Sequence, residues 1–157
     1  MESQLIETWQ IHNRVHLYLL DSIKPEVLPE VLNAVSASKG RNVAEQFAHL
    51  HNVRLMWLKS AAPDLLAGLE KIEKEAVAGK QLLCASLEAS GKAIETLLGK
   101  GFAEGKIKGF KPHAAAFLGY LISHESHHRG QIMLALKQAG YPVNKKVGFG
   151  IWEWGTR

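Results

Sequence analysis

The sequence predicts an all-α protein, a four-helix bundle, on three observations. Apolar residues recur at steps of three and four along four separate segments, which is the spacing of one helical face. The strand-like alternation of apolar and polar residues is nearly absent. The connection from about Lys59 to Gly79 is too long for a tight hairpin, and a long link of this kind is what a crossover between two parallel helices requires.

The first predicted helix covers about Ser3 to Asp21, and Pro25 follows its end. Steps of three and four residues place one set of side chains on a single face: Leu5, Trp9, His12, His16, Leu19 and Leu20. This face is apolar apart from its two histidines, so we expect it to pack inside the bundle.

The second predicted helix begins after Asn42 and stops at Pro63. Asn42 is suited to cap the helix, and Glu45 stands at the third helical position, where its carboxylate can reach back as in a capping box. We expect one face to point toward the core, with Phe47, Leu50 and Leu58 flanking it: Gln46, His49, Val53, Met56 and Trp57.

The third predicted helix covers Lys80–Leu98 and is closed by Gly99 and Gly101. The fourth covers about Pro112–Ala139 and ends before Gly140. Its inward stripe combines apolar residues with a carboxylate and an imidazole: Leu118, Leu121, Ile122, Glu125, His128, Ile132 and Leu136. The segment LLAGLEKIEKEA favours a short extra helix in the long connection, and the tail KKVGFGIWEWGTR is expected to fold back over a bundle end.

Length and composition indicate one globular domain over residues 1–157, because 46% of the 157 residues are hydrophobic and 22% are charged. The apolar runs are too short to span a membrane, and MESQLIETWQ is acidic where a signal peptide would be basic, so we expect a cytoplasmic protein. The lone Cys84 is expected as a small buried apolar residue. A net charge of +4 permits anion binding, but its lysines lack interleaved aromatic residues, and we expect no direct nucleic-acid binding.

The segment HESHHRGQIM carries the strongest chemical signal. His124 and His128 are four residues apart on one helical face, so both imidazoles can converge on one metal ion. Gln131 lies one turn further and could orient a ligand or a bound water through a hydrogen bond. His127 points about 60° away from His124 and is a poorer partner. The alternative is a solvated or core-satisfied histidine pair without a metal.

A third imidazole, His49, is expected on the core side of the second helix, where it needs a partner. Three histidines would leave an open coordination position, as in catalytic zinc sites. His12 and His16 have the same spacing as His124 and His128, and spacing alone does not choose between the two pairs. His51 points to another face, and His113 lies roughly 16 Å from His124 along the axis.

The sequence resembles the DinB-like (DinB/YfiT-like) family over nearly its whole length. NVAEQFAHLHNVRLMWL is similar to the family's second-helix histidine followed eight residues later by a tryptophan, HESHHRGQIM to its fourth-helix metal motif, and GYPVNKKVGFGIWEW to its C-terminal end. The resemblance implies that His49, His124 and His128 bind one divalent ion. It also implies a four-helix bundle of up-down-down-up topology, often assembled as a homodimer. His12 and His16 match no metal position of the family, and His127 and Arg129 match the motif without an assigned chemical step.

For function, the resemblance implies two classes. Some DinB-like relatives are transferases or isomerases that use a low-molecular-weight thiol such as bacillithiol or mycothiol, and many others take their name from expression after DNA damage. The first hypothesis is a metalloenzyme for a small-molecule substrate, in which zinc or nickel lowers the pKa of a bound thiol or water for S-transfer or hydrolysis. Glu125 could be its base or a buried supporting carboxylate. The alternative is a non-catalytic metal-binding stress-response module.

Overall fold

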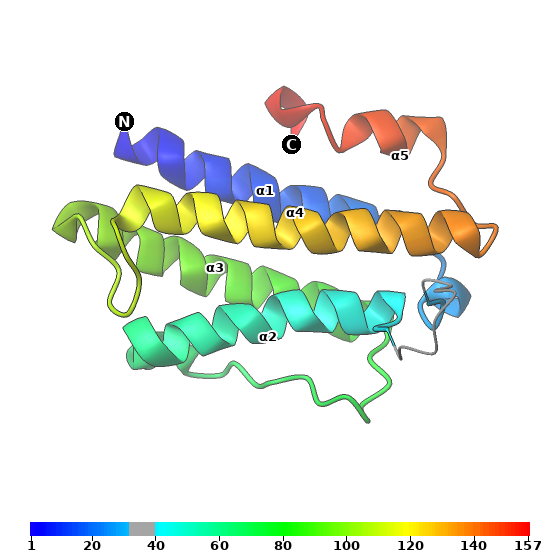
Figure 1. The fold of residues 1–157 in the computed structure, drawn as a ribbon, viewed down its shortest axis with the longest axis horizontal. Helices are drawn as coiled ribbons and strands as arrows, with labels where there is room; N and C mark the ends of the chain where they lie inside the picture. The colour runs from blue at the N-terminus through cyan, green and yellow to red at the C-terminus, as the bar shows by residue number, and fades with distance from the viewer. Residues whose placement is uncertain (32–39) are drawn as a thin grey trace.

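The computed structural model of the chain describes residues 1–31 and 40–157. Its regular structure in those ranges is helical, and four long helices lie side by side (Figure 1). They are α1 (Glu2–Ser22), α2 (Val43–Ala61), α3 (Lys80–Glu104) and α4 (Ala114–Gln138). The prediction of an all-helical bundle is therefore confirmed.

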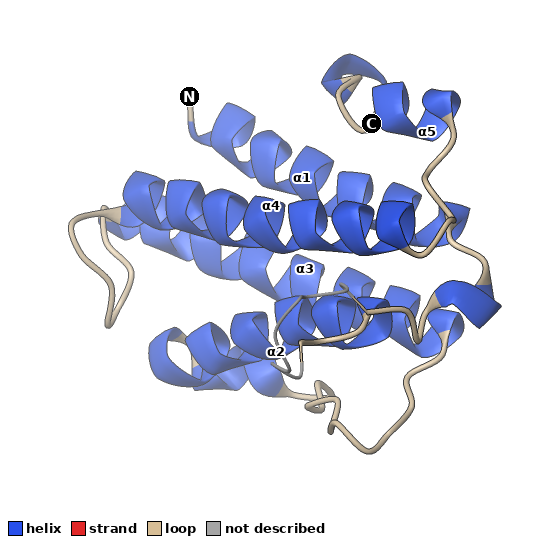
Figure 2. Cartoon of the chain, turned by 45° about the vertical axis from the view of Figure 1, so that its right-hand side comes forward, coloured by secondary structure: helices blue, strands red, loops and turns tan. Residues whose placement is uncertain are grey.

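The connection between α2 and α3 runs the length of the bundle. In Figure 1 the chain leaves the left end of α2 and returns beneath it to the right end, where α3 begins. Figure 2 shows this return as the longest described loop of the chain. The helical structure in this connection is a short 3-10 helix, η2 (Pro63–Leu66). A second 3-10 helix, η1 (Pro25–Val27), lies elsewhere, after α1.

The extra helix expected in the segment LLAGLEKIEKEA is not present beyond η2. The backbone there makes isolated turn bonds, such as Leu69 N–H to the Leu66 carbonyl and Ala76 N–H to the Glu73 carbonyl, and it also bonds to side chains of α2. The Asn52 side chain donates to the Ile72 carbonyl at 2.9 Å and accepts from the Ile72 amide at 3.0 Å, and a ring nitrogen of His51 lies 2.9 Å from the Glu70 carbonyl oxygen. These bonds hold the connection extended along α2, which satisfies its polar groups without a helix.

The predicted capping box at the start of α2 is confirmed. The Asn42 side chain accepts from the Glu45 amide at 2.7 Å, and the Glu45 carboxylate accepts from the Asn42 amide at 2.8 Å. At α4, the His113 ring caps the helix by accepting from the Ala116 amide at 3.1 Å. His113 thus has a structural task at a helix end.

The predicted end of α3 is wrong, because the helix continues through Gly99 and Gly101 to Glu104. Neither glycine has a positive φ; the left-handed residue that ends the helix is Gly105, at φ 74°. Gly101 is needed for packing, since a Cβ there would collide with the Ile107 side chain of the following loop. Gly101 is therefore a position of close packing and does not mark the end of the helix, contrary to the sequence prediction.

The buried face of α2 also differs from the predicted one. Phe47, Leu50, Arg54 and Leu58 are fully buried, whereas Met56 is 53% exposed. His49 is only half-buried. Of the predicted core face, Gln46 is buried and His49, Val53 and Trp57 are partly buried, whereas the residues expected to flank that face form the core. Phe47 and Leu50 belong to one core cluster of the bundle, and Leu58 belongs to the other.

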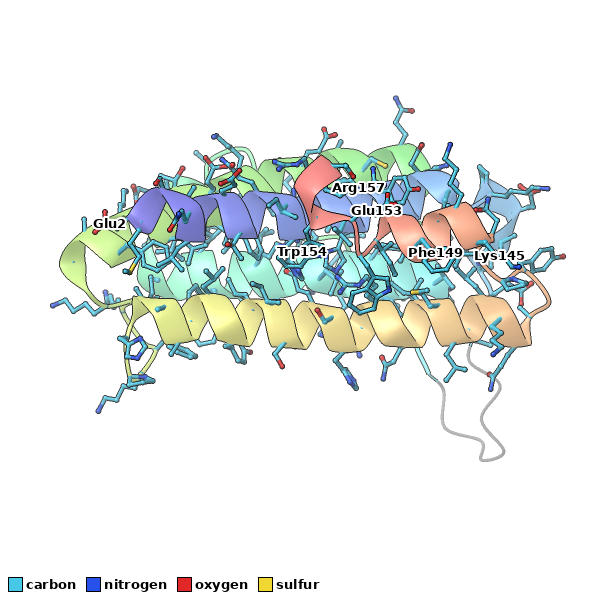
Figure 3. All side chains as sticks on the ribbon, turned by 90° about the horizontal axis from the view of Figure 1, so that it is seen from above. Glu2, Lys145, Phe149, Glu153, Trp154 and Arg157 are labelled. Carbon is cyan, nitrogen blue, oxygen red and sulfur yellow. The ribbon has the colours of Figure 1, made fainter. Side chains whose placement is uncertain are left out.

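The C-terminal tail folds back along the side of α1, not over a bundle end as predicted. It contains α5 (Lys145–Gly150) and η3 (Trp154–Thr156) and lies over α1 in the view from above (Figure 3). Arg14 donates to the Arg157 carbonyl at 2.8 Å, and the Arg157 guanidinium lies 3.8 Å from the centre of the Tyr18 ring. Cys84 on α3 is only partly buried, against the expectation of full burial.

Candidate metal centre

Three imidazoles from two helices meet between α2 and α4. His49 comes from α2, and His124 and His128 come from successive turns of α4. One nitrogen of each ring lies within 4.8 Å of the corresponding nitrogens of the other two, so the group could hold a metal ion. The ring centres of His49 and His128 are 4.5 Å apart, and those of His124 and His128 are 4.7 Å apart.

A line of side-chain amides fixes the orientation of His128. Its Nδ1 lies 2.7 Å from the Gln46 amide oxygen, which can only accept, so Nδ1 carries the hydrogen. Gln46 in turn donates to Gln131 at 3.0 Å, and Gln131 donates to His127 Nε2 at 3.1 Å. With Nδ1 protonated, the Nε2 atom of His128 keeps a lone pair for a ligand, which is the usual arrangement of a histidine that binds metal.

His124 leaves a buried nitrogen without a protein partner. Its Nδ1 is shielded from solvent and makes no hydrogen bond within the described part of the chain. The Tyr120 ring lies nearly parallel to the His124 ring, at a centre-to-centre distance of 6.1 Å. A buried polar atom without a partner is costly, and a bound ion would remove that cost if Nδ1 is the coordinating nitrogen.

All three imidazoles are held in the neutral form that binds metal. Burial, together with the positive charge of Arg41 and the neighbouring His124, lowers the pKa of His49 from 6.5 to about 4. Burial and the adjacent His49 and His124 lower the pKa of His128 to about 4, and burial also lowers the pKa of His124. The residues therefore fit a divalent ion, because the ligands need no deprotonation near neutral pH.

A cavity of about 740 Å³ adjoins the cluster on the side of His49. Its described lining comes from the segment after α1, from the start of α2 and from the end of the connection to α3. It includes cations and carboxylates: Arg41, Glu45, Lys71, Glu73, Lys74 and Glu75. His124 and His128 do not line it. A small polar molecule in this cavity would reach the cluster through His49.

The second histidine pair also finds a carboxylate. His12, His16 and Glu125 bring donor atoms within 4.8 Å of one another, and all three are buried. His12 Nε2 lies 3.0 Å from Glu125 Oε2, and Arg54 holds both oxygens of the same carboxylate. Because the Arg54 cation already neutralises Glu125, a second cation there would meet an uncompensated positive charge, so this group fits an ion poorly.

Two residues of the site were not identified from the sequence as functional. Gln46 contacts His128, and the sequence feature that could have identified it is its position as a polar residue one turn before His49 on the same face. Arg54 forms an ion pair with Glu125, and the sequence feature that could have identified it is a charged residue at helical spacing from the apolar Phe47 and Leu50. The sequence predicts that Gln131 could hold a ligand or a bound water by a hydrogen bond; in the structure it bonds to His127 and to Gln46, which in turn contacts His128.

The protein is thus a helical bundle whose second and fourth long helices share a group of histidines able to hold a metal ion. The model of the DinB family matches residues 103–147, from the end of α3 to the start of α5. That match supports the assignment of the chain to the DinB-like family and covers His124 and His128 but not His49. No curated protein matches the sequence. In the described ranges, none of the helices is both long and apolar enough to cross a bilayer.

Proposed function

We propose that this DinB-like protein binds one divalent metal ion through His49, His124 and His128. The observation that carries the proposal is the convergence of three imidazoles from two helices, with His128 oriented by Gln46. The supporting electrostatics are the lowered pKa values, which keep the imidazoles neutral. Zinc and nickel suit an all-imidazole donor set best.

The finer features of the fold belong to the same proposal. We propose the up-down-down-up order of helices, which the return of the connection along α2 supports (Figure 1). We also propose a homodimer. Phe149 and Trp152 of the C-terminal tail are 69% and 72% exposed, which supports burial of this surface by a second chain.

The proposed activity is transfer of a low-molecular-weight thiol to a small electrophile, with hydrolysis as the related possibility. A bound zinc or nickel ion would supply Lewis acidity and lower the pKa of a coordinated thiol or water. The protein's contribution is to position that ion and the substrate. His49 is the residue of the cluster that lines the cavity, where Arg41 and Lys71 can attract anionic groups and Glu45 can accept from donors.

The activity is tested with zinc-loaded protein, bacillithiol or mycothiol, and an aryl halide electrophile, by following thioether formation. The matched control is His128→Ala, and His113→Ala serves as a second control because His113 only caps α4. The proposal predicts turnover in the parent and in His113→Ala and its loss in His128→Ala. Equal rates in all three proteins, at the level of free zinc, would refute a thiol transferase.

One observation favours a second candidate, a metal-binding module without turnover. Glu125 was the carboxylate considered as a base, and both of its oxygens are bound by Arg54 in a fully buried position. It therefore cannot collect a proton from a substrate in the cavity. A parent protein that binds zinc stoichiometrically but accelerates neither thiol transfer nor ester hydrolysis would support this candidate.

A further inference from the structure

Behind the three imidazoles lies a buried ion pair between the two helices that carry them. Arg54 of α2 is 0% exposed and Glu125 of α4 is 1% exposed. Arg54 Nε donates to Glu125 Oε1 at 2.7 Å, and Arg54 Nη2 donates to Glu125 Oε2 at 2.8 Å. The contact is thus two-pronged, which restricts both the distance and the angle between the planar groups.

The remaining donors of Arg54 reach the other two helices. Its Nη1 donates to the Asn13 side chain of α1 at 2.8 Å and to the Leu87 carbonyl of α3 at 3.0 Å. Glu125 also contacts α1, since its Oε2 lies 3.0 Å from His12 Nε2. One guanidinium therefore bonds to residues of all three other long helices.

Arg54 and Glu125 lie close in sequence to the proposed ligands on both helices. Glu125 directly follows His124 and comes three residues before His128, and Arg54 comes five residues after His49. A slide or rotation of α2 against α4 would move His49 relative to the other two imidazoles. The same motion would break the two parallel hydrogen bonds. The pair therefore resists any change in the distance between His49 and the other two imidazoles.

Stability alone does not account for a buried charged pair. Removing two charges from water is expensive, and an apolar pair of similar size often gives an equally or more stable protein. The directional bonds do supply what apolar packing lacks, a single allowed register between two helices. We propose that Arg54 and Glu125 are positioning residues that hold α2 and α4 at the spacing required for His49, His124 and His128 to bind one ion.

The inference rests on the proposed metal binding and is tested by replacing the whole pair. The variant is Arg54→Met/Glu125→Met, which leaves no unpaired buried charge and keeps apolar volume in the core. The matched control is Lys92→Gln/Glu95→Gln, which removes an ion pair within α3 in which Lys92 is 72% exposed. The readouts are the zinc Kd by chelator competition, the visible absorption spectrum of the Co²⁺-loaded protein, and the Tm without metal.

The Met/Met variant is expected to stay folded with a Tm lowered by the loss of the bonds to His12, Asn13 and Leu87, to bind zinc at least about tenfold more weakly, and to show an altered Co²⁺ spectrum. The control should match the parent in all three readouts. A second variant, Arg54→Lys, keeps the charge without the two-pronged contact and should also weaken zinc binding and change the spectrum.

A folded Met/Met or Arg54→Lys protein with the parent's Kd and spectrum would overturn the inference alone. Unfolding of both variants would also overturn it, because the pair would then be required for the fold itself. A parent protein that binds neither zinc nor cobalt would overturn the proposed metal function and the inference with it.

Discussion

His128 Nδ1 and the Gln46 amide oxygen are 2.7 Å apart across the contact between α4 and α2. The bond fixes which ring nitrogen of His128 carries the hydrogen and which way the ring faces. Gln46 also lies one turn before His49, the only residue of the imidazole group that α2 supplies. One amide thus links the two helices that would share the ion.

Replacing Gln46 should weaken metal binding without abolishing it. In Gln46→Leu the His128 ring loses the acceptor that orients it, and loss of such a supporting bond typically lowers affinity about 10–100-fold. We expect the zinc Kd to rise by that factor in a chelator competition assay. The matched control is Gln81→Leu, the same change at an exposed position of α3. Equal zinc affinity in the two variants would contradict the role of Gln46.

His49 and His51 should separate metal binding from stability. His49→Ala should abolish stoichiometric zinc binding and lower the metal-free free energy of unfolding by about 1 kcal/mol or less, because the side chain is half-buried. His51→Ala should leave zinc binding intact but cost about 1–3 kcal/mol, because buried His51 contacts the carbonyls of Glu70 and Ser86.

The measurement is urea unfolding of both variants with and without zinc. Zinc at a hundred times its Kd should stabilise the parent and His51→Ala by about 2.7 kcal/mol and leave His49→Ala unchanged. Zinc stabilisation of His49→Ala equal to that of the parent would remove His49 from the site.

The metal-free protein should lose stability as the pH falls from 6.5 toward 4. The pKa values of His49 and His128 are lowered from 6.5 to about 4 in the folded protein, chiefly by burial. Between these values the unfolded chain takes up protons that the folded one does not, so acid favours unfolding. The check is the urea midpoint across this range, and His49→Asn/His128→Asn should show a shallower decline. An unchanged pH dependence in that variant would contradict these pKa shifts.

Breaking the buried pair on one side should be far costlier than replacing both partners. Glu125→Leu leaves the Arg54 charge buried without its carboxylate, and such a loss typically costs about 3–5 kcal/mol. The Lys92–Glu95 pair, whose side chains are 72% and 19% exposed, should contribute about 0–1 kcal/mol. Urea unfolding compares Glu125→Leu with Arg54→Met/Glu125→Met and with Lys92→Gln; a loss below about 1 kcal/mol in Glu125→Leu would contradict the cost of a buried unpaired Arg54 charge.

The bundle was predictable because its signals are local. Helical spacing gave the four long helices, and the Asn42–Glu45 capping box fixed the start of α2. The end of α3 was missed because Gly101 serves a contact with Ile107, a residue beyond the helix, which no local pattern reveals. The connection stayed extended because Asn52 bonds to Ile72, a partner known only from the fold.

The candidate site was predictable in its residue types and only partly in its surroundings. Spacing placed His124 and His128 on one face of α4, the sequence also predicted His49 as the third imidazole, and the structure brings the three together. Spacing gave His12 and His16 equal weight, and only the folded arrangement shows that Arg54 already supplies the cation beside Glu125. Pairings between helices depend on how the helices dock, so the sequence could not reveal them.

Metal content measured by plasma mass spectrometry shows directly whether the three imidazoles hold an ion. The samples are tag-free parent protein purified without added metal, together with His49→Ala and His128→Ala prepared identically. We expect about one zinc or nickel ion per parent chain and almost none in either variant. A parent protein that carries no metal and takes up neither ion on addition would contradict this expectation, and the three imidazoles would then be a polar contact between α2 and α4.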